Sequence, residues 1–225
     1  MLRRFRYEAD NRYGLPTVAF FLSTIILFTI IAIISRFSPK FVRNSGIYKR
    51  TSALSRYLSY KGWRISALQW YSPAAGVWLL GAVGAIFFLS MTLGPRPYYW
   101  PNTETVNFGN SPPIATRAGW MSIASLPFLF MLSAKDNPIS LLTRIPYEKL
   151  IVFHKWVAWA MYVLALVHTF PFIIHHMWKG DMWETWTTDV FYWTGVVALL
   201  AQTWLQFMSI GPIRYVFKLC VFPFY

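Results

Sequence analysis

The chain has 225 residues, of which 56% are hydrophobic and only 13% are charged, with 12 Trp, 13 Tyr and 19 Phe. This composition is typical of an integral membrane protein and far from that of a soluble domain. The single cysteine, Cys220, excludes an intrachain disulfide, a CxxC redox pair and a thiolate metal cage. The net charge of +13 does not indicate a nucleic-acid partner, because the basic residues lie beside apolar segments and form no basic domain.

The apolar runs predict an all-α fold, a polytopic transmembrane helix bundle of about five spans. The spans are expected at Leu15 to Ile34, Ser72 to Leu93, Gly119 to Ala134, Leu150 to Ile174 and Thr188 to Met208. In the second span, Gly76 and Gly84 share similar faces and would allow close helix contact. Pro127 is expected to kink the third span. In the last span, Gln202 and Gln206 lie four residues apart, so both amides should point into the bundle.

A basic segment separates the first two spans. It contains no acidic residue, and its cations are Arg36, Lys40, Arg43, Lys49, Arg50, Arg56, Lys61 and Arg64. Because Lys and Arg accumulate in short cytoplasmic loops, residues 35–70 are predicted to form a cytoplasmic loop beside anionic membrane lipids. The helix at 15–34 is expected to remain as an anchor, since its apolar run is too long for a signal peptide. Alternation across five spans then places the N-terminal tail, residues 1–14, outside.

The stretch from Pro146 to Met177 carries two histidines inside an apolar run that is long enough to cross a bilayer. His154 and His168 are fourteen residues apart, so at about 100° and 1.5 Å per residue they share a face and lie about 21 Å apart along a helix. That geometry suits two redox centres stacked across a hydrocarbon core, although an intramembrane histidine also serves as a hydrogen-bonding core residue. His175 and His176 follow Pro171, and they are interpreted as solvated residues at the outer interface.

Three segments together resemble a known family. They are GNSPPIATRAGW from Gly109 to Trp120, EKLIVFHKWVAWAMYVLALVHTFPFI from Glu148 to Ile173, and SIGPIR from Ser209 to Arg214. These segments are similar to the ferric reductase transmembrane domain of fungal plasma-membrane metalloreductases, whose superfamily includes the NADPH oxidases. The resemblance covers roughly Trp70 to Arg214, so residues 71–214 are interpreted as a partial ferric reductase-like haem-binding domain and 215–225 as a divergent tail.

The resemblance implies a transmembrane route for electrons. In such proteins cytoplasmic NADPH reduces FAD, and electrons then pass through two b-type haems to ferric or cupric chelates outside, for iron uptake. By this resemblance His154 and His168 are axial ligands of the inner and outer haem iron, and Arg117 is a candidate partner for the outer haem's propionates. Lys155 and Arg144 are weaker candidates for the inner haem, because interfacial anchoring by snorkelling side chains is the preferred explanation for both. Location in the plasma membrane also follows from the resemblance.

The family's second histidine pair and its FAD and NADPH domains have no counterpart in this sequence. After Arg214 the sequence reads YVFKLCVFPFY, and no phosphate-cradling glycine motif occurs in the 225 residues. The expectation at this stage is a C-terminally truncated reductase component that cannot reduce iron with NADPH by itself.

Three alternatives remain open from the sequence. The chain could be a haem-free scaffold or regulator that pairs with a full-length relative, or an NADPH oxidase-like fragment. It could also be a transporter or channel with a polar pathway, although no internal repeat supports that reading. No strong ligand cluster identifies the metal at the outer face. Asp181 and Glu184, with the neighbouring histidines, would attract cations there or simply form a solvated acidic loop.

Overall fold

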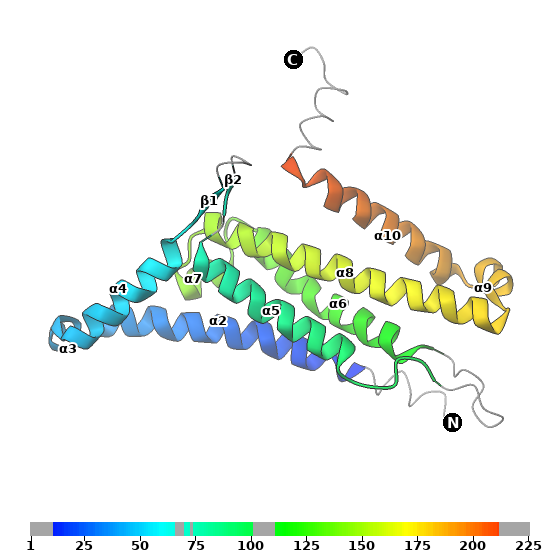
Figure 1. Ribbon diagram of the computed structural model, residues 1–225, viewed down its shortest axis with the longest axis horizontal. Helices are drawn as coiled ribbons and strands as arrows, with labels where there is room; N and C mark the ends of the chain where they lie inside the picture. The colour runs from blue at the N-terminus through cyan, green and yellow to red at the C-terminus, as the bar shows by residue number, and fades with distance from the viewer. Residues whose placement is uncertain (1–10, 66–69, 73, 101–110, 212–225) are drawn as a thin grey trace, which may run out of the picture. The chain divides into compact units, whose positions relative to one another are not determined.

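The computed structural model describes residues 11–65, 70–72, 74–100 and 111–211 (Figure 1). Within these ranges the protein is helical, apart from two short antiparallel strands, β1 (Arg64–Ile65) and β2 (Trp70–Tyr71). The helices are α2 (Gly14–Phe37), α3 (Lys40–Asn44), α4 (Gly46–Tyr60), α5 (Ala75–Leu93), α6 (Pro113–Ser133), α7 (Pro138–Thr143), α8 (Tyr147–Lys179), α9 (Met182–Thr188) and α10 (Val190–Met208). The predicted all-α class is therefore confirmed.

Four of the described helices, α2, α5, α6 and α8, are long and apolar enough to cross a membrane. They match the first four predicted spans, although α6 begins at Pro113, six residues before the predicted start, and α8 extends to Lys179. The fifth predicted span coincides with α10, a 19-residue helix that is not among these four candidate spans. The chain is thus an integral, multi-pass membrane protein whose apolar helices lie in lipid.

The chain forms two compact units. Unit 1 comprises Met1–Val18, Met91–Pro127 and Val157–Tyr225, and unit 2 comprises Ala19–Ser90 and Phe128–Trp156. Helices α2, α5, α6 and α8 contribute residues to both units. Each unit contains one of the two histidines that the sequence singles out.

Aromatic stacking holds the helices of unit 2 together. Phe20 of α2 stacks on Phe87 of α5 at 4.5 Å, and Phe21 stacks on Phe128 of α6 at the same centroid distance. Because Phe20 lies near the start of α2 and Phe87 near the end of α5, the two helices run in opposite directions. Gly81 provides the closest approach in α5, since a Cβ there would lie 3.0 Å from the Trp156 ring. Gly76 and Gly84, the predicted contact positions, would place a Cβ 3.5 Å from Ser59 Cα and 3.9 Å from the Phe20 ring, so Gly81, which was not predicted, has the tightest contact of the three.

The basic segment between α2 and α5 is not an irregular loop. It contains α3, α4 and the β1–β2 pair, and Ser45 caps the start of α4 by accepting a hydrogen bond from the Tyr48 amide. The segment joins the membrane helices at both ends. Ser38 and Pro39 are the only residues between α2 and α3, and the Ala75 amide donates to the Lys61 carbonyl at 2.9 Å.

In unit 1, α8 packs against α6 and α10. The Ser122 hydroxyl of α6 donates to the Met161 carbonyl of α8 at 3.5 Å, and Thr203 of α10 donates to the Tyr162 hydroxyl at 3.2 Å. Gln206 is buried and Gln202 is half-buried, which confirms the inward position predicted for Gln206. Pro127, where a kink was predicted, lies within α6, and the helix continues past it to Ser133.

Candidate functional site

The clearest constellation in unit 1 surrounds His168 on α8. Its Nδ1 lies 2.8 Å from the main-chain carbonyl oxygen of Ala115 on α6. A carbonyl oxygen only accepts hydrogen bonds, so Nδ1 must carry the proton and donate it. In the neutral ring this leaves the Nε2 lone pair for another partner. Phe172, one helical turn further along α8, packs edge-on against the imidazole at 5.2 Å and restricts its rotation.

Gly119 provides the space in which the His168 ring lies. A Cβ at position 119 would lie only 2.6 Å from Nδ1 and 2.9 Å from Cε1 of His168. Ala115 and Gly119 are four residues apart, so they lie on the same face of α6, one below the other. The absence of a side chain at Gly119 therefore allows the ring to reach the Ala115 carbonyl. Residue spacing gave no signal for this role, because the two positions are 49 residues apart in the chain.

His154 has the same kind of environment in unit 2. Its Nδ1 lies 3.0 Å from the main-chain carbonyl oxygen of Leu129 on α6, and the side chain is half-buried. The same reasoning assigns the proton to Nδ1 and leaves Nε2 as the free lone pair. Both predicted histidines thus use one ring nitrogen to anchor themselves to the main chain of α6.

This arrangement suits metal ligation. Histidines that bind metals almost always donate their second ring N–H to a carbonyl or carboxylate, which fixes the tautomer and the ring orientation. The two histidines are in separate units, and the described residues contain no group of three or more His, Cys, Asp or Glu able to hold a bare metal ion. The donor set therefore fits single imidazole ligands to the iron of a bound haem, and it does not fit a metal cage made of protein ligands alone.

Arg117 is a buried cation near the start of α6, with only 2% of its surface exposed. Its guanidinium lies 5.5 Å from the centroid of the Tyr13 ring, and its Nε and Nη2 donors have no hydrogen-bond partner among the described residues. Arg117 lies two residues from Ala115 and two from Gly119. At about 100° per residue it therefore projects from roughly the opposite side of α6 to the face that contacts His168. Its proposed contact with a propionate stays a prediction.

The two weaker cation candidates are exposed. Lys155 follows His154 on α8, and Arg144 ends α7 with a left-handed backbone at φ 56°. Exposed, snorkelling cations at helix ends account for both side chains. Their assignment to a haem propionate also stays a prediction.

The interpretation of His175 and His176 as solvated residues was wrong. His175 is buried, with 1% of its surface exposed, and the side chain of His176 is only 14% exposed. The reason is that α8 continues through Pro171 to Lys179, so the inward face extends to the end of the helix. His175 lies seven residues after His168, which at about 100° per residue returns to nearly the same direction. This spacing was the available signal for the burial of His175.

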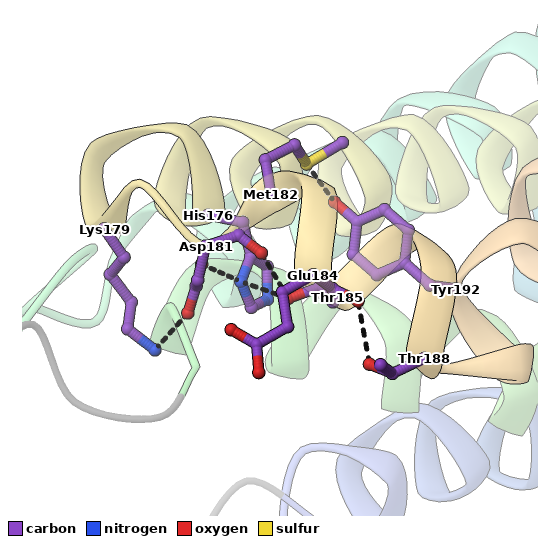
Figure 2. Close-up of polar contacts among 8 residues, drawn as sticks. All are labelled: His176, Lys179, Asp181, Met182, Glu184, Thr185, Thr188 and Tyr192. Atoms are coloured by element: carbon purple, nitrogen blue, oxygen red, sulfur yellow. Dashed lines mark hydrogen bonds and ion pairs between the residues drawn. The ribbon is translucent and has the colours of Figure 1, made fainter.

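The C-terminal end of α8 forms a polar cluster with the segment leading into α9 (Figure 2). The Asp181 carboxylate accepts from His176 Nδ1 at 2.7 Å and pairs with Lys179 Nζ at 2.9 Å. Burial raises the pKa of the Asp181 carboxyl, but the hydrogen bonds and positive charges of Lys179 and His176 outweigh this effect and lower the pKa overall. The cluster therefore links the C-terminal end of α8 to the segment before α9 through one contact to each carboxylate oxygen.

Comparison with known proteins supports the resemblance found in the sequence. Residues 118–223 match the family described as "Ferric reductase like transmembrane component". The matched segment contains both His154 and His168. Arg117 lies immediately before it.

The similar proteins are fungal reductases. Ferric/cupric reductase transmembrane component 7 of Saccharomyces cerevisiae is 30% identical over 153 residues, which cover 62% of this chain and 24% of that protein. The probable cell surface ferric reductase kap2 of Aspergillus oryzae is 32% identical over 133 residues, which cover 58% of this chain and 17% of that protein. The chain thus spans a quarter or less of the length of these relatives. No solved structure matches it at a significant level.

Proposed function

We propose that this chain is a membrane component of a ferric or cupric reductase, in which His154 and His168 each supply one axial imidazole to a b-type haem. The observation that carries the proposal is the shared hydrogen bond from Nδ1 to a main-chain carbonyl of α6, at 3.0 Å for His154 and 2.8 Å for His168. Because a carbonyl oxygen only accepts hydrogen bonds, Nδ1 carries the proton in each ring. The Nε2 lone pair of each ring is then available as a metal ligand.

The chemistry follows from these ligands. When bound, a haem would supply transfer of single electrons, and this chain would hold each haem through one imidazole, that of His154 or His168. The residues of this chain hold and orient the imidazoles. Gly119 leaves room for the His168 ring. The carbonyl oxygens of Ala115 and Leu129 accept hydrogen bonds from Nδ1 of His168 and His154, and the apolar helices exclude water.

Electron supply and acceptor are part of the same proposal. Cytoplasmic NADPH and FAD as the source, and ferric or cupric chelates as acceptors, come from the resemblance and from the names of the similar proteins. All of the fungal relatives named above are reductases, which favours a metal acceptor over oxygen. The same likeness suggests the plasma membrane. The basic segment between α2 and α5 supports a cytoplasmic position for that segment and an outer position for the N-terminus.

The test is a reduced-minus-oxidised absorption spectrum of the detergent-purified 225-residue chain, with haem quantified against protein. Haem bands that diminish separately in His154→Ala and His168→Ala would support the proposal, because each variant removes one Nε2 ligand. His176→Ala is the matched control, since that imidazole is bound to Asp181 and should leave the bands unchanged. A folded chain without haem, or with haem bands insensitive to both ligand variants, would contradict the proposal and favour a haem-free scaffold.

A further inference from the structure

Helix α4 carries an apolar stripe that no part of the described protein covers. Ile47, Leu54 and Leu58 fall within about 20° of one direction on the helix. Their exposed fractions are 78%, 58% and 43%, and α4 contains no buried residue. Amphipathic helices at protein surfaces normally turn such a stripe toward the core.

The side of α4 that contacts the protein is instead polar. Tyr48 and Ser52 are half-buried, and a Cβ at Gly76 of α5 would meet the Cα of Ser59 at 3.5 Å. These three α4 residues are displaced from Ile47 by about 100° to 140° around the helix. The helix therefore presents tyrosine and serine residues to its protein neighbours and aliphatic groups outward. This inverted arrangement is stable only where the outward side meets an apolar medium.

Both ends of α4 are held at the ends of apolar membrane helices. Ser38, Pro39 and the short α3 connect it to the C-terminal end of α2, and the Lys61 carbonyl accepts from the first amide of α5. Tyr60 also accepts a hydrogen bond from Lys149 near the start of α8, at 3.1 Å. Because α2 and α5 are long and apolar enough to span a bilayer, these connections keep α4 at the membrane surface.

The charge around α4 identifies the kind of surface. Between Asp10 and Glu104 the sequence contains no acidic residue, whereas α3, α4 and their flanks carry Lys40, Arg43, Lys49, Arg50, Arg56 and Lys61. Arg50 lies about 60° from the stripe, where a long side chain can reach headgroups from a helix embedded at their level. Such cations are attracted to anionic lipids close to the membrane surface.

We propose that α4 is an interfacial helix that binds anionic phospholipid at the membrane face where α2 ends. Ile47, Leu54 and Leu58 enter the boundary between headgroups and acyl chains, Arg50 and Lys61 contact headgroup phosphates, and Arg56, about 180° from Ile47, faces water. This proposal stands on unit 2 alone and does not depend on haem binding or on reductase activity.

The test places an environment-sensitive fluorophore at Leu54→Cys or Arg56→Cys in the full chain, with Cys220→Ser removing the single native cysteine. The chain is reconstituted into vesicles of phosphatidylcholine with phosphatidylserine. At position 54 we expect the fluorescence to be quenched by doxyl-labelled lipid and not by iodide. At position 56 we expect it to be quenched by iodide and not by doxyl-labelled lipid. Iodide quenching at position 54 would overturn the proposal, because the stripe would then face water.

Two further measurements distinguish anionic lipid from a second copy of the chain and from neutral lipid as the partner of the apolar stripe. Protection of position 54 from both quenchers, with cross-linked dimers, would assign the stripe to a second copy of the chain and overturn the lipid assignment. In pure phosphatidylcholine, or in the double variant Arg50→Gln and Lys61→Gln, we expect a loss of lipid quenching at position 54. Equal quenching in neutral and anionic vesicles would overturn the role of anionic headgroups.

Discussion

Helix α8 contains histidines in two contrasting environments. His154 and His168 lie in its apolar part and donate Nδ1–H to main-chain carbonyls, whereas His176 lies near its C-terminal end and donates to the Asp181 carboxylate. A carbonyl in an apolar helix fixes the tautomer of the ring without adding a charge. The carboxylate of Asp181 is charged and also pairs with Lys179. Histidine is thus oriented as a candidate ligand in the apolar part of α8, and it is part of an ion-pair cluster near the C-terminal end of the helix.

The contrast shows that the atom contacted by Nδ1 says more about the role of a histidine than its position along the helix does. His154 and His168, whose Nδ1 atoms contact main-chain carbonyls, carry the proposed ligand role, whereas His176, eight residues after His168, contacts a carboxylate. Changes to the contacts of each environment should therefore have separate consequences: loss of haem for the first, and altered stability for the second.

The largest effect is expected for Gly119→Ala. The new Cβ would lie 2.6 Å from His168 Nδ1, so the ring must move and lose the Ala115 carbonyl. Overpacking of this kind costs about 1–3 kcal/mol, and the haem bands that depend on His168 should be lost. Absorption spectra and detergent unfolding of the purified chain provide the measurement. Gly195→Ala is the control, because a Cβ at position 195 meets nothing within 4 Å; equal spectra for both variants would contradict the role of Gly119.

Substitution of Arg117 tests whether this buried cation contributes to haem binding or only to the contact with Tyr13. Arg117→Met should remove the contact with the Tyr13 ring and cost about 2 kcal/mol, the value for a desolvated cation–π pair. A double-mutant cycle with Tyr13→Leu measures this coupling by detergent unfolding. A cycle showing no coupling would exclude the Tyr13 contact as the reason for burial. Loss of haem in Arg117→Met but not in Tyr13→Leu would support the propionate role.

Asp181→Asn probes the carboxylate-bonded environment and should cost about 0.5 kcal/mol near neutral pH, because the pair is partly exposed. Since the pKa of Asp181 is lowered in the folded protein, its contribution is present above the pKa of the unfolded chain and is lost as pH falls through the folded value. Thermal unfolding should therefore show a wild-type advantage at neutral pH that disappears in acid. Glu184→Gln removes the same charge three residues away and serves as control. A change in the haem bands of Asp181→Asn would break the separation between the two environments.

The smallest effect is expected for Arg144→Gly in unit 2. Arg144 has φ 56°, a left-handed conformation that glycine adopts without a Cβ penalty, so relief of about 0.5 kcal/mol is expected after glycine's entropic cost. Unfolding of the purified chain measures this gain, and the His154-dependent haem bands should not change. Loss of those bands, together with their retention in Arg144→Lys, would instead support contact between this cation and a propionate.

The apolar runs were sufficient to predict the all-α class and four of the membrane helices, because crossing a bilayer requires about 20 apolar residues in one continuous segment. Helical periodicity similarly singled out His154 and His168, since their common face depends only on local geometry. The same periodicity would have predicted burial of His175, but that residue was interpreted as solvated because it follows Pro171 and adjoins the predicted outer surface. These properties are local, and the sequence by itself determined them.

Contacts between distant segments were decided by the tertiary structure alone. No local pattern shows that Ala115 supplies the carbonyl for His168, that Leu129 does so for His154, or that Gly119 leaves the necessary space. The outward stripe of α4 was hidden for the same reason: periodicity identifies an apolar face, but only the packed neighbours show which way it turns. Helix–helix register depends on side-chain packing between segments far apart in the chain, and that packing exists only in the folded protein.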